Sequence, residues 1–174
     1  TIRQIARAAS IEGGSVYYHY SSKQDLLESI FSDGNKILLE AATEALSIAR
    51  SNPKEILRQL VHAHLRVMEN DPAQFVVVTR ELQRLTGKMK KRVMNQRNEY
   101  ELHFRQNLES GITQGYYRTC DIKLVSFGII GLLNSVVYWY NAKGSASISN
   151  IADEYTELVL QGITADKSDG EGAT

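Results

Sequence analysis

Apolar residues recur at helical spacing along almost the whole chain, and only two prolines, Pro53 and Pro72, occur among its 174 residues. Spacings of three and four residues are typical of one face of a helix, and no convincing run of alternating residues indicates a strand. Because proline ends or kinks helices, its scarcity leaves room for long ones. We therefore expect an all-α fold.

Caps, glycines and prolines divide this pattern into successive helices. The expected spans are 1–9, 15–20, from a cap at Ser21 or Ser22 to Arg50, 53–70, 75–85, from Gly87 to Gly115, 122–142 and 148–163. We place an N-terminal domain at residues 1–32 and a larger helical domain at 33–164. Residues 165–174 are small, polar and acidic, and we expect a disordered tail there.

Composition excludes a chain that is disordered throughout, a collagen-like repeat and a disulfide scaffold. Lys plus Arg and Asp plus Glu each number 20, so the strongly basic balance of many nucleic-acid-binding proteins is absent. The single cysteine, Cys120, cannot form an internal disulfide, which fits a reducing compartment. The uncharged run Leu124–Ala142 is only just long enough for a membrane span. With a mean hydropathy of −0.29 for the chain, a helix buried on all sides is the better interpretation.

The first 27 residues carry the most specific motif. They read T-I-R-Q-I-A-R-A-A, then S-I-E-G-G-S-V-Y-Y-H-Y, then S-S-K-Q-D-L-L. Two short helices joined by a tight turn and followed by a long helix indicate a helix-turn-helix. The residues resemble the DNA-binding domain of the TetR family of transcriptional regulators, including its unusual Tyr-x-His-aromatic core. This resemblance implies a helix-turn-helix domain followed by a helical bundle that binds a ligand and dimerises.

Three departures from the family pattern have structural consequences. Ser10 occupies the turn position where the family usually has glycine, a residue that tolerates positive φ. Tyr20 replaces the usual phenylalanine, so its hydroxyl needs a partner. The family's first helix is missing from this chain, and we expect a basic segment before Thr1 in the full-length protein.

The resemblance also implies a set of DNA contacts. Small or glycine residues let the backbone approach a duplex closely, and hydroxyl, imidazole and lysine groups suit phosphates. Val16 and Tyr20 are expected to pack inward. The residues expected nearest the bases are Gly13, Gly14 and Tyr17, and those nearest the backbone are Thr1, Ser15, Tyr18, His19 and Lys23.

The larger domain is expected to dimerise through its last two helices, Ile122–Ala142 and Ile148–Ile163, and to hold an effector pocket. Dimerisation would let two heads read half-sites one helical turn apart. Each pocket candidate can also be plain core, and we expect His64 to be a core histidine with its hydrogen bonds satisfied. The candidates are Met68, Phe75, Tyr100, Phe104, Asn134, Tyr138 and Trp139.

Residues 80–97 form one strongly basic stretch. A solvated helix surface explains it, and so does a docking site for an anionic effector, with Arg80 and Arg84 as candidate contacts. The segment R-E-L-Q-R-L at 80–85 is similar to that of regulators of fatty-acid and sterol breakdown, which implies an acyl-CoA thioester as effector. A fatty acid or an aromatic acid would also suit an apolar pocket with a basic rim.

These patterns lead to a cytoplasmic, ligand-responsive DNA-binding regulator. We expect a repressor that a small hydrophobic or acyl-CoA-type effector releases from a palindromic double-stranded operator. We identify no catalytic residue, metal ligand or cofactor motif, and no membrane partner. Two alternatives stay open, an enzyme that uses His64 or Cys120 and a helical protein-interaction adaptor whose reading head has lost DNA binding.

Overall fold

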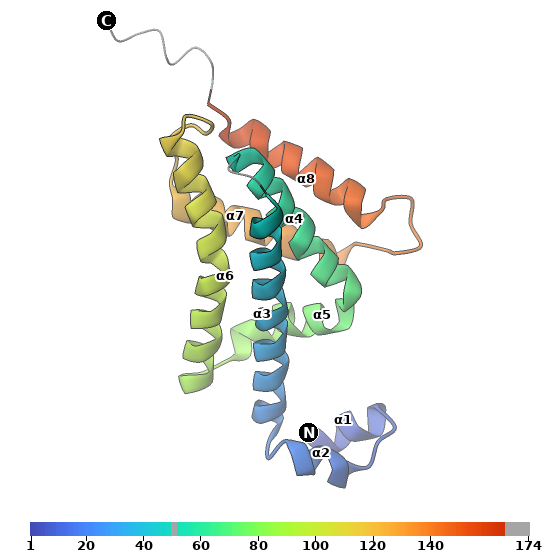
Figure 1. Ribbon diagram of the computed structural model, residues 1–174. Helices are drawn as coiled ribbons and strands as arrows, with labels where there is room; N and C mark the ends of the chain where they lie inside the picture. Colours follow the sequence, from blue (N-terminus) through green and yellow to red (C-terminus); the bar gives the residue numbers. More distant parts are fainter. Residues whose placement is uncertain (50–51, 166–174) are drawn as a thin grey trace, which may run out of the picture.

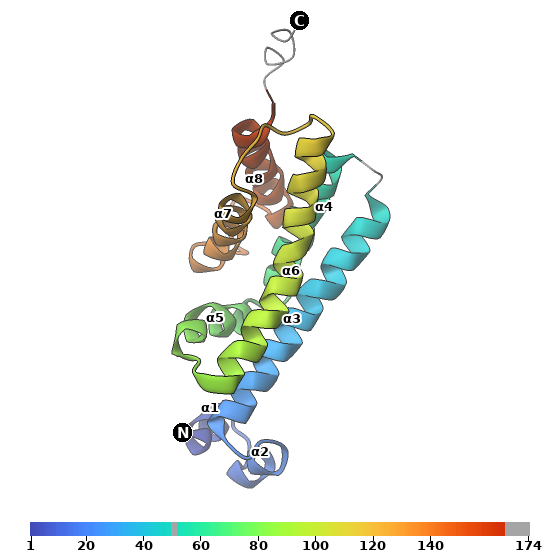
Figure 2. The same ribbon diagram turned by 90° about the vertical axis from the view of Figure 1, so that its left-hand side faces the viewer.

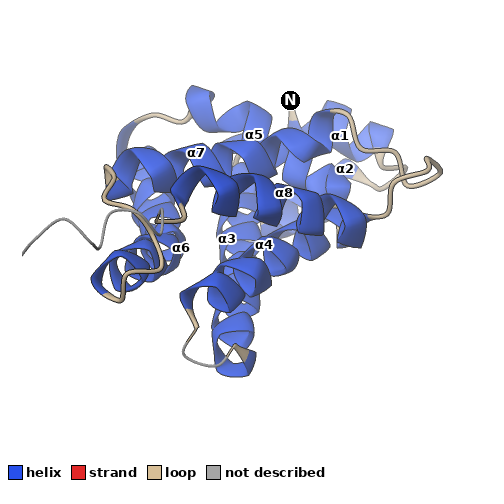
Figure 3. Ribbon diagram, turned by 90° about the horizontal axis from the view of Figure 1, so that it is seen from above, coloured by secondary structure: helices blue, strands red, loops and turns tan. Residues whose placement is uncertain are grey.

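The computed structural model describes residues 1–49 and 52–165, and within them the chain is helical (Figure 3). The described part contains no strand, apart from an isolated backbone bridge between Tyr117 and Thr164. This confirms the expected all-α fold. The predicted tail at 165–174 lies almost entirely outside the described residues. The elements are α1 (Ile2–Ala8), α2 (Gly13–His19), α3 (Lys23–Ile48), α4 (Pro53–Asn70), α5 (Pro72–Glu81), the 3-10 turn η1 (Leu82–Arg84), α6 (Gly87–Thr113), α7 (Ile122–Ser135), the 3-10 turn η2 (Val136–Tyr138) and α8 (Ile148–Ile163).

Helix α3 connects the two ends of the molecule (Figure 1). The short helices α1 and α2 lie at its N-terminal end, and we call this pair the reading head (residues 2–19). Further along, α3 packs against α4 and α6, while α8 lies along α4 and α7 packs on α6 (Figures 1 and 2). The reading head is therefore joined to the bundle by one continuous helix.

Local sequence signals explain where the helices begin. The Thr1 hydroxyl accepts a hydrogen bond from the third helical residue, and that residue's side chain bonds back to the Thr1 backbone, forming a capping box. Ser22 caps α3 by accepting from the backbone N–H of Asp25. Pro53 and Pro72 occupy first-turn positions of α4 and α5, where a missing N–H has no cost. The expected starts at Thr1, Ser22 and Pro53 are confirmed. Helix α5 begins at Pro72, earlier than the expected Phe75, and ends at Glu81 before the 3-10 turn η1.

The second short helix begins earlier than expected. We expected it at 15–20, but α2 covers Gly13–His19. Glycine's low helix propensity argued against the earlier start. The backbone N–H of Ser15 nevertheless bonds to the carbonyl of Glu12, so both glycines lie within the first turn.

The helix in the uncharged run is shorter and more exposed than expected. Continuous helix was expected to Ala142, but α7 ends at Ser135, whose hydroxyl donates to the carbonyl of Leu132. Such back-bonding competes with the helical pattern, and the β-branched pair after it lowers helix propensity. Burial on all sides was also wrong for the single chain, since Leu124 is 67% and Phe127 49% exposed.

Within residues 1–49 and 52–165, apolar side chains form three separate cores. The largest joins α3, α4, α6, α7 and α8, and a second lies around Phe31, where α3 meets α5 and the start of α6. The reading head has a small core of its own, made of Ile2, Ala6 and Val16 with Tyr20 packed against it. The expected inward packing of Val16 and Tyr20 is confirmed.

The end of α6 is fixed by a close contact. Gly115, with φ of +75°, ends the helix as expected and lets the chain turn back. The ring of Tyr117 then lies against Gly111, where a Cβ would stand 2.0 Å from a ring carbon.

None of the described helices combines the length and apolar character needed to cross a membrane.

Candidate nucleic-acid interface and buried cavity

The turn between α1 and α2 is built around Ser10. Its φ is +56°, the left-handed conformation expected from its place in the motif. The N–H of Ile11 bonds to the carbonyl of Ala6, and the N–H of Ser10 bonds to that of Arg7. This is the Schellman pattern, which usually has glycine at the left-handed position. Serine therefore makes the same turn at a conformational cost.

The outer face of α2 is open to solvent. Tyr17 is 48% and Tyr18 85% exposed, and a Cβ at Gly13 or Gly14 would have no neighbour within 4 Å. Val16 points the other way, into the small core of the head. The helix thus separates one packed residue from a face available to a partner. The other predicted contacts, Thr1, Ser15, His19 and Lys23, are exposed as well.

Two arginines of α1 extend this face. Arg3 and Arg7 are exposed and border a shallow hollow that Gly13, Gly14 and Tyr17 also line. Neither arginine was predicted from the sequence as a DNA contact. Helical spacing of four residues, beside the reading helix, was the signal that could have found them. They add positive charge to a face whose predicted contacts are mostly neutral.

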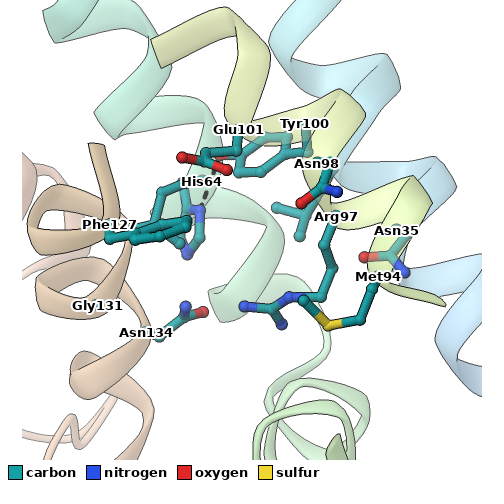
Figure 4. A pocket seen from close by; sticks show the side chains of 12 residues that line it. Asn35, His64, Met94, Arg97, Asn98, Tyr100, Glu101, Phe127, Gly131 and Asn134 are labelled. Atoms are coloured by element: carbon teal, nitrogen blue, oxygen red, sulfur yellow. Dashed lines mark hydrogen bonds between the residues drawn. The ribbon is translucent and has the colours of Figure 1, made fainter. Parts of the chain in front are cut away.

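The bundle contains a cavity of about 180 Å³ between α3, α4, α6 and α7. Polar and apolar side chains share its wall, and Figure 4 shows them around the open space. We call this space the cavity throughout. Its lining residues are Asn35, Leu38, His64, Met94, Arg97, Asn98, Tyr100, Glu101, Phe127, Ile130, Gly131 and Asn134.

Arg97 is the cation of the cavity. Its guanidinium extends into the space from α6 (Figure 4), and burial lowers its pKa, an effect that the charge of Glu101 partly offsets. The Glu101 carboxylate already bonds to Arg105, at 2.7 and 2.9 Å, and to Ser126, at 2.6 Å. Among residues 1–49 and 52–165, no hydrogen bond or ion pair is formed by the Arg97 side chain.

Glu101 is itself held in the charged form. Burial alone would raise the pKa of this carboxyl, but hydrogen bonds from Arg105 and Ser126, with the charges of Arg105 and Lys123, bring it below its usual value. Both carboxylate oxygens therefore have partners outside the cavity. Glu101 contributes negative charge near Arg97 without neutralising it by contact.

His64 was expected to be a satisfied core histidine, and this holds for only one of its nitrogens. Nδ1 lies 2.8 Å from the hydroxyl of Tyr100, whereas Nε2 is buried and has no hydrogen-bond partner in the described part of the chain. Burial, together with the positive charge of Arg97, lowers the pKa of His64 to about 3, and the hydrogen-bonding effect of the nearby Asn134 side chain opposes this shift only weakly. The ring is therefore neutral at physiological pH, with one polar atom left for the cavity.

The structure brings only some of the predicted effector residues together. Tyr100 and Asn134 line the cavity. Met68, Phe75 and Phe104 lie in the main core beside it, whereas Tyr138 and Trp139 are 56% and 51% exposed. Arg80 and Arg84 lie on the surface outside the cavity, and Arg84 pairs with Glu81 at 2.8 Å. Arg97, His64, Asn35 and Asn98 are wall residues that sequence reasoning did not propose as ligand contacts.

Apolar side chains are exposed on α7 and α8. Leu124 and Phe127 of α7 and Leu158 of α8 are between 49% and 67% exposed. Gly128 and Gly131 lie on α7, and a Cβ at either would meet no atom within 4 Å. In the single chain these surfaces have no covering element among the described residues.

Both parts of the chain match models of known protein families. Residues 1–30 match the model of bacterial regulatory proteins of the tetR family, and residues 50–163 match a tetracyclin repressor-like C-terminal domain. The chain is 31% identical over 166 residues to the HTH-type transcriptional repressor KstR2 of Mycobacterium tuberculosis. That alignment covers 94% of this chain and 82% of the repressor.

Solved structures agree with the sequence matches. The structure of the ketosteroid transcriptional regulator KstR2 of Mycobacterium tuberculosis superposes with a TM-score of 0.85 at 28% identity, covering 95% of this chain and 85% of that one. AibR, solved with isovaleryl coenzyme A and operator DNA, gives a TM-score of 0.81 over 92% of this chain and 86% of its own. At 21% identity, the AibR likeness shows the fold alone.

Proposed function

The chain belongs to the TetR family of bacterial regulatory proteins, and on this premise we propose that it is a ligand-responsive repressor. It binds a double-stranded operator through the reading head and is released when a small hydrophobic effector enters the cavity. The family consists of transcriptional regulators, which are not enzymes. We propose that it acts in the bacterial cytoplasm.

The continuity of α3 is the observation that carries this proposal. Lys23 begins the helix beside the reading head, and Asn35 and Leu38 of the same helix line the cavity. An effector that binds one tilt of α3 better than another shifts the position of the head by that difference in affinity. The domain division near residue 32 therefore falls inside a shared helix.

The open face of α2 supports the assignment of the DNA contacts. Tyr17 and the two glycines, Gly13 and Gly14, are proposed to lie against the base edges. Thr1, Ser15, Tyr18, His19 and Lys23 are proposed to contact the phosphate backbone. To these we add Arg3 and Arg7, whose exposed cations border the same hollow.

We propose that a homodimer forms through α7 and α8. Their exposed apolar side chains would be covered by the same surface of a second copy, as in a two-fold interface. A dimer also presents two reading heads to a palindromic operator. The two glycines on α7 permit close approach of a partner helix.

Two sets of observations point to different chemical classes of effector. Acyl-CoA binding is suggested by the similarity of residues 80–85 and by what AibR binds. In that case Arg80 and Arg84 would hold phosphates at the surface. The polar wall of the cavity, with Arg97 and His64, instead favours a free acid.

Fluorescence anisotropy tests the repressor. Full-length protein is titrated against DNA from upstream of its own gene and against random DNA, with and without acyl-CoA thioesters or hydrophobic acids. Preferential binding that weakens on addition of one of these compounds supports a ligand-responsive repressor. Equal binding to both DNAs at every salt concentration contradicts the repressor proposal and favours the adaptor. Binding through phosphate contacts alone does not depend on sequence, and it weakens steeply as the salt concentration rises.

A further inference from the structure

Donor groups from several helices line the cavity. Among them are the Arg97 guanidinium of α6, the His64 ring of α4 and the Asn134 amide of α7 (Figure 4). We infer that the effector is a small organic acid whose carboxylate binds between Arg97 and His64. This inference rests on the proposed function, because it takes the cavity as the effector site.

Arg97 supplies the charge that selects an anion. Placing a cation away from water is costly unless it is paired, and no carboxylate of the described chain contacts this guanidinium. The nearby carboxylate of Glu101 is engaged by Arg105 and Ser126. A ligand carboxylate would supply the missing partner, and it matches the planar guanidinium fork in a bidentate pair.

His64 supplies a second, neutral contact. When the Tyr100 hydroxyl donates to Nδ1, the proton of the neutral imidazole is on Nε2, the nitrogen without a partner. That N–H then donates to an acceptor in the cavity. Burial raises the pKa of Tyr100, so its hydroxyl keeps the proton that this arrangement needs. An acceptor such as a carboxylate oxygen satisfies a buried atom that is otherwise left unbonded.

The size and apolar part of the wall limit the rest of the ligand. Leu38, Phe127 and Ile130 line the cavity, whose volume is about 180 Å³. An apolar cavity of roughly 150 Å³ holds a benzene molecule. A ring or a short alkyl chain bearing one carboxylate therefore fits. A thioester carbonyl in the same place carries no negative charge and would leave the Arg97 cation unpaired.

Isothermal titration calorimetry on the full-length protein without DNA tests the inference. The probes are benzoate and hexanoate, each compared with its uncharged amide, benzamide or hexanamide. We expect each acid to bind about 10–100-fold more tightly than its amide, the range of a charge-assisted hydrogen bond. Arg97→Met should reduce acid binding by the same factor and leave amide binding unchanged.

Two further variants control for folding and for general charge. Arg66→Met removes an exposed arginine of α4, two residues from His64 but outside the cavity, and should leave acid binding unchanged. Arg97→Lys keeps the charge but loses the fork, so its affinity for acids should lie between those of wild type and Arg97→Met. Thermal melts without ligand should show Arg97→Met at least as stable as wild type, because a half-buried cation without an ion-pair partner is removed.

Three results would overturn the inference. These are equal affinity for acids and amides, equal acid binding by wild type and Arg97→Met, and binding of hexanoyl-CoA without any binding of the acids. Because no DNA is present, these outcomes are independent of the operator titration. A protein that prefers its operator but ignores the acids loses this inference alone, and one that binds the acids without preferring the operator loses the repressor proposal.

Discussion

The hydroxyl of Tyr100 lies 2.8 Å from Nδ1 of His64, and both side chains are buried. This bond joins α4 to α6 and fixes the orientation of the imidazole. Phe75 packs edge-on against the same ring, with centroids 5.3 Å apart. These two contacts hold the ring with Nε2 on the cavity side, where Asn134 is its nearest polar neighbour from α7.

His64 should make the protein less stable in mild acid. Burial lowers its pKa to about 3 in the folded protein, against about 6.5 in the unfolded chain. Between these values the unfolded chain takes up a proton that the folded protein excludes. The contribution of His64 to the free energy of unfolding is therefore fully present above pH ~6.5. It falls as the pH decreases and is about 2 kcal/mol smaller at pH ~5. Urea denaturation at about pH 7 and pH 5 measures the change.

His64→Gln isolates this effect from other groups. Burial also lowers the pKa of His103, which adds a loss of the same sign, and Glu101 acts in the same direction at lower pH. The groups around His64 itself are Arg97, Tyr100 and Glu101. The variant should lose less stability between the two pH values than wild type does. An equal loss in both proteins would show that His64 does not titrate as described.

Replacing Ser10 with glycine should stabilise the folded protein. Its φ of +56° costs a residue with a side chain about 1 kcal/mol relative to glycine. Ser10→Gly is therefore expected to raise the free energy of unfolding by about 0.5–1 kcal/mol, whereas Ser10→Val should lower it, because β-branched residues avoid this conformation. Thermal melts compare the three proteins, and a destabilising effect of glycine would contradict the assignment.

Tyr17 and Lys23 should affect DNA binding in different ways. Tyr17→Ala removes a proposed base contact and should cost about 1–3 kcal/mol at one base position, relaxing specificity there. Lys23→Ala removes a proposed phosphate contact, so it should weaken binding to all sequences and reduce the salt slope by about one. Anisotropy titrations on operator variants and random DNA at several salt concentrations separate the two. Identical profiles for both variants would reject the division into base and phosphate contacts.

The exposed apolar face of α7 and α8 should determine the oligomeric state. Leu124→Glu combined with Leu158→Glu places charges on both helices and should give a monomer in light-scattering measurements. Operator affinity should then fall on the order of 100-fold, because the two half-sites are no longer bound together. Ile48→Glu is the matched control, since Ile48 is 64% exposed on α3. A dimer that survives the double substitution would exclude this interface.

Local signals in the sequence predicted much of the fold. Caps at Thr1 and Ser22 and the proline at position 53 act on their own helix, so they could be identified without knowing what packs around them. The end of α7 at Ser135 was not predicted, because an uncharged run contains no strong helix terminator. The exposure of Leu124 also depends on which side of α7 faces the core, a property set by tertiary packing.

The cavity depended on contacts between distant residues. Tyr100 and Asn134 were proposed from their chemistry, but Arg97 was assigned only to a basic surface stretch. Its half-buried position in the cavity arises because α6 packs against both α3 and α7, and periodicity does not show that arrangement. His64 was recognised as part of an apolar stripe, but its unbonded nitrogen becomes visible only when Tyr100 is placed beside it.

Because α3 is one continuous helix, a change of its tilt at the cavity would move the reading head. From Asn35 to Lys23 the helix rises about 18 Å, at 1.5 Å per residue. A tilt of roughly 10° about the cavity end would therefore displace the head by about 3 Å, close to the 3.4 Å rise of one base pair. In a dimer both heads would swing, so the separation of the two reading helices would change by about two base-pair steps. A ligand as small as benzoate could in this way put the pair out of register with adjacent major grooves.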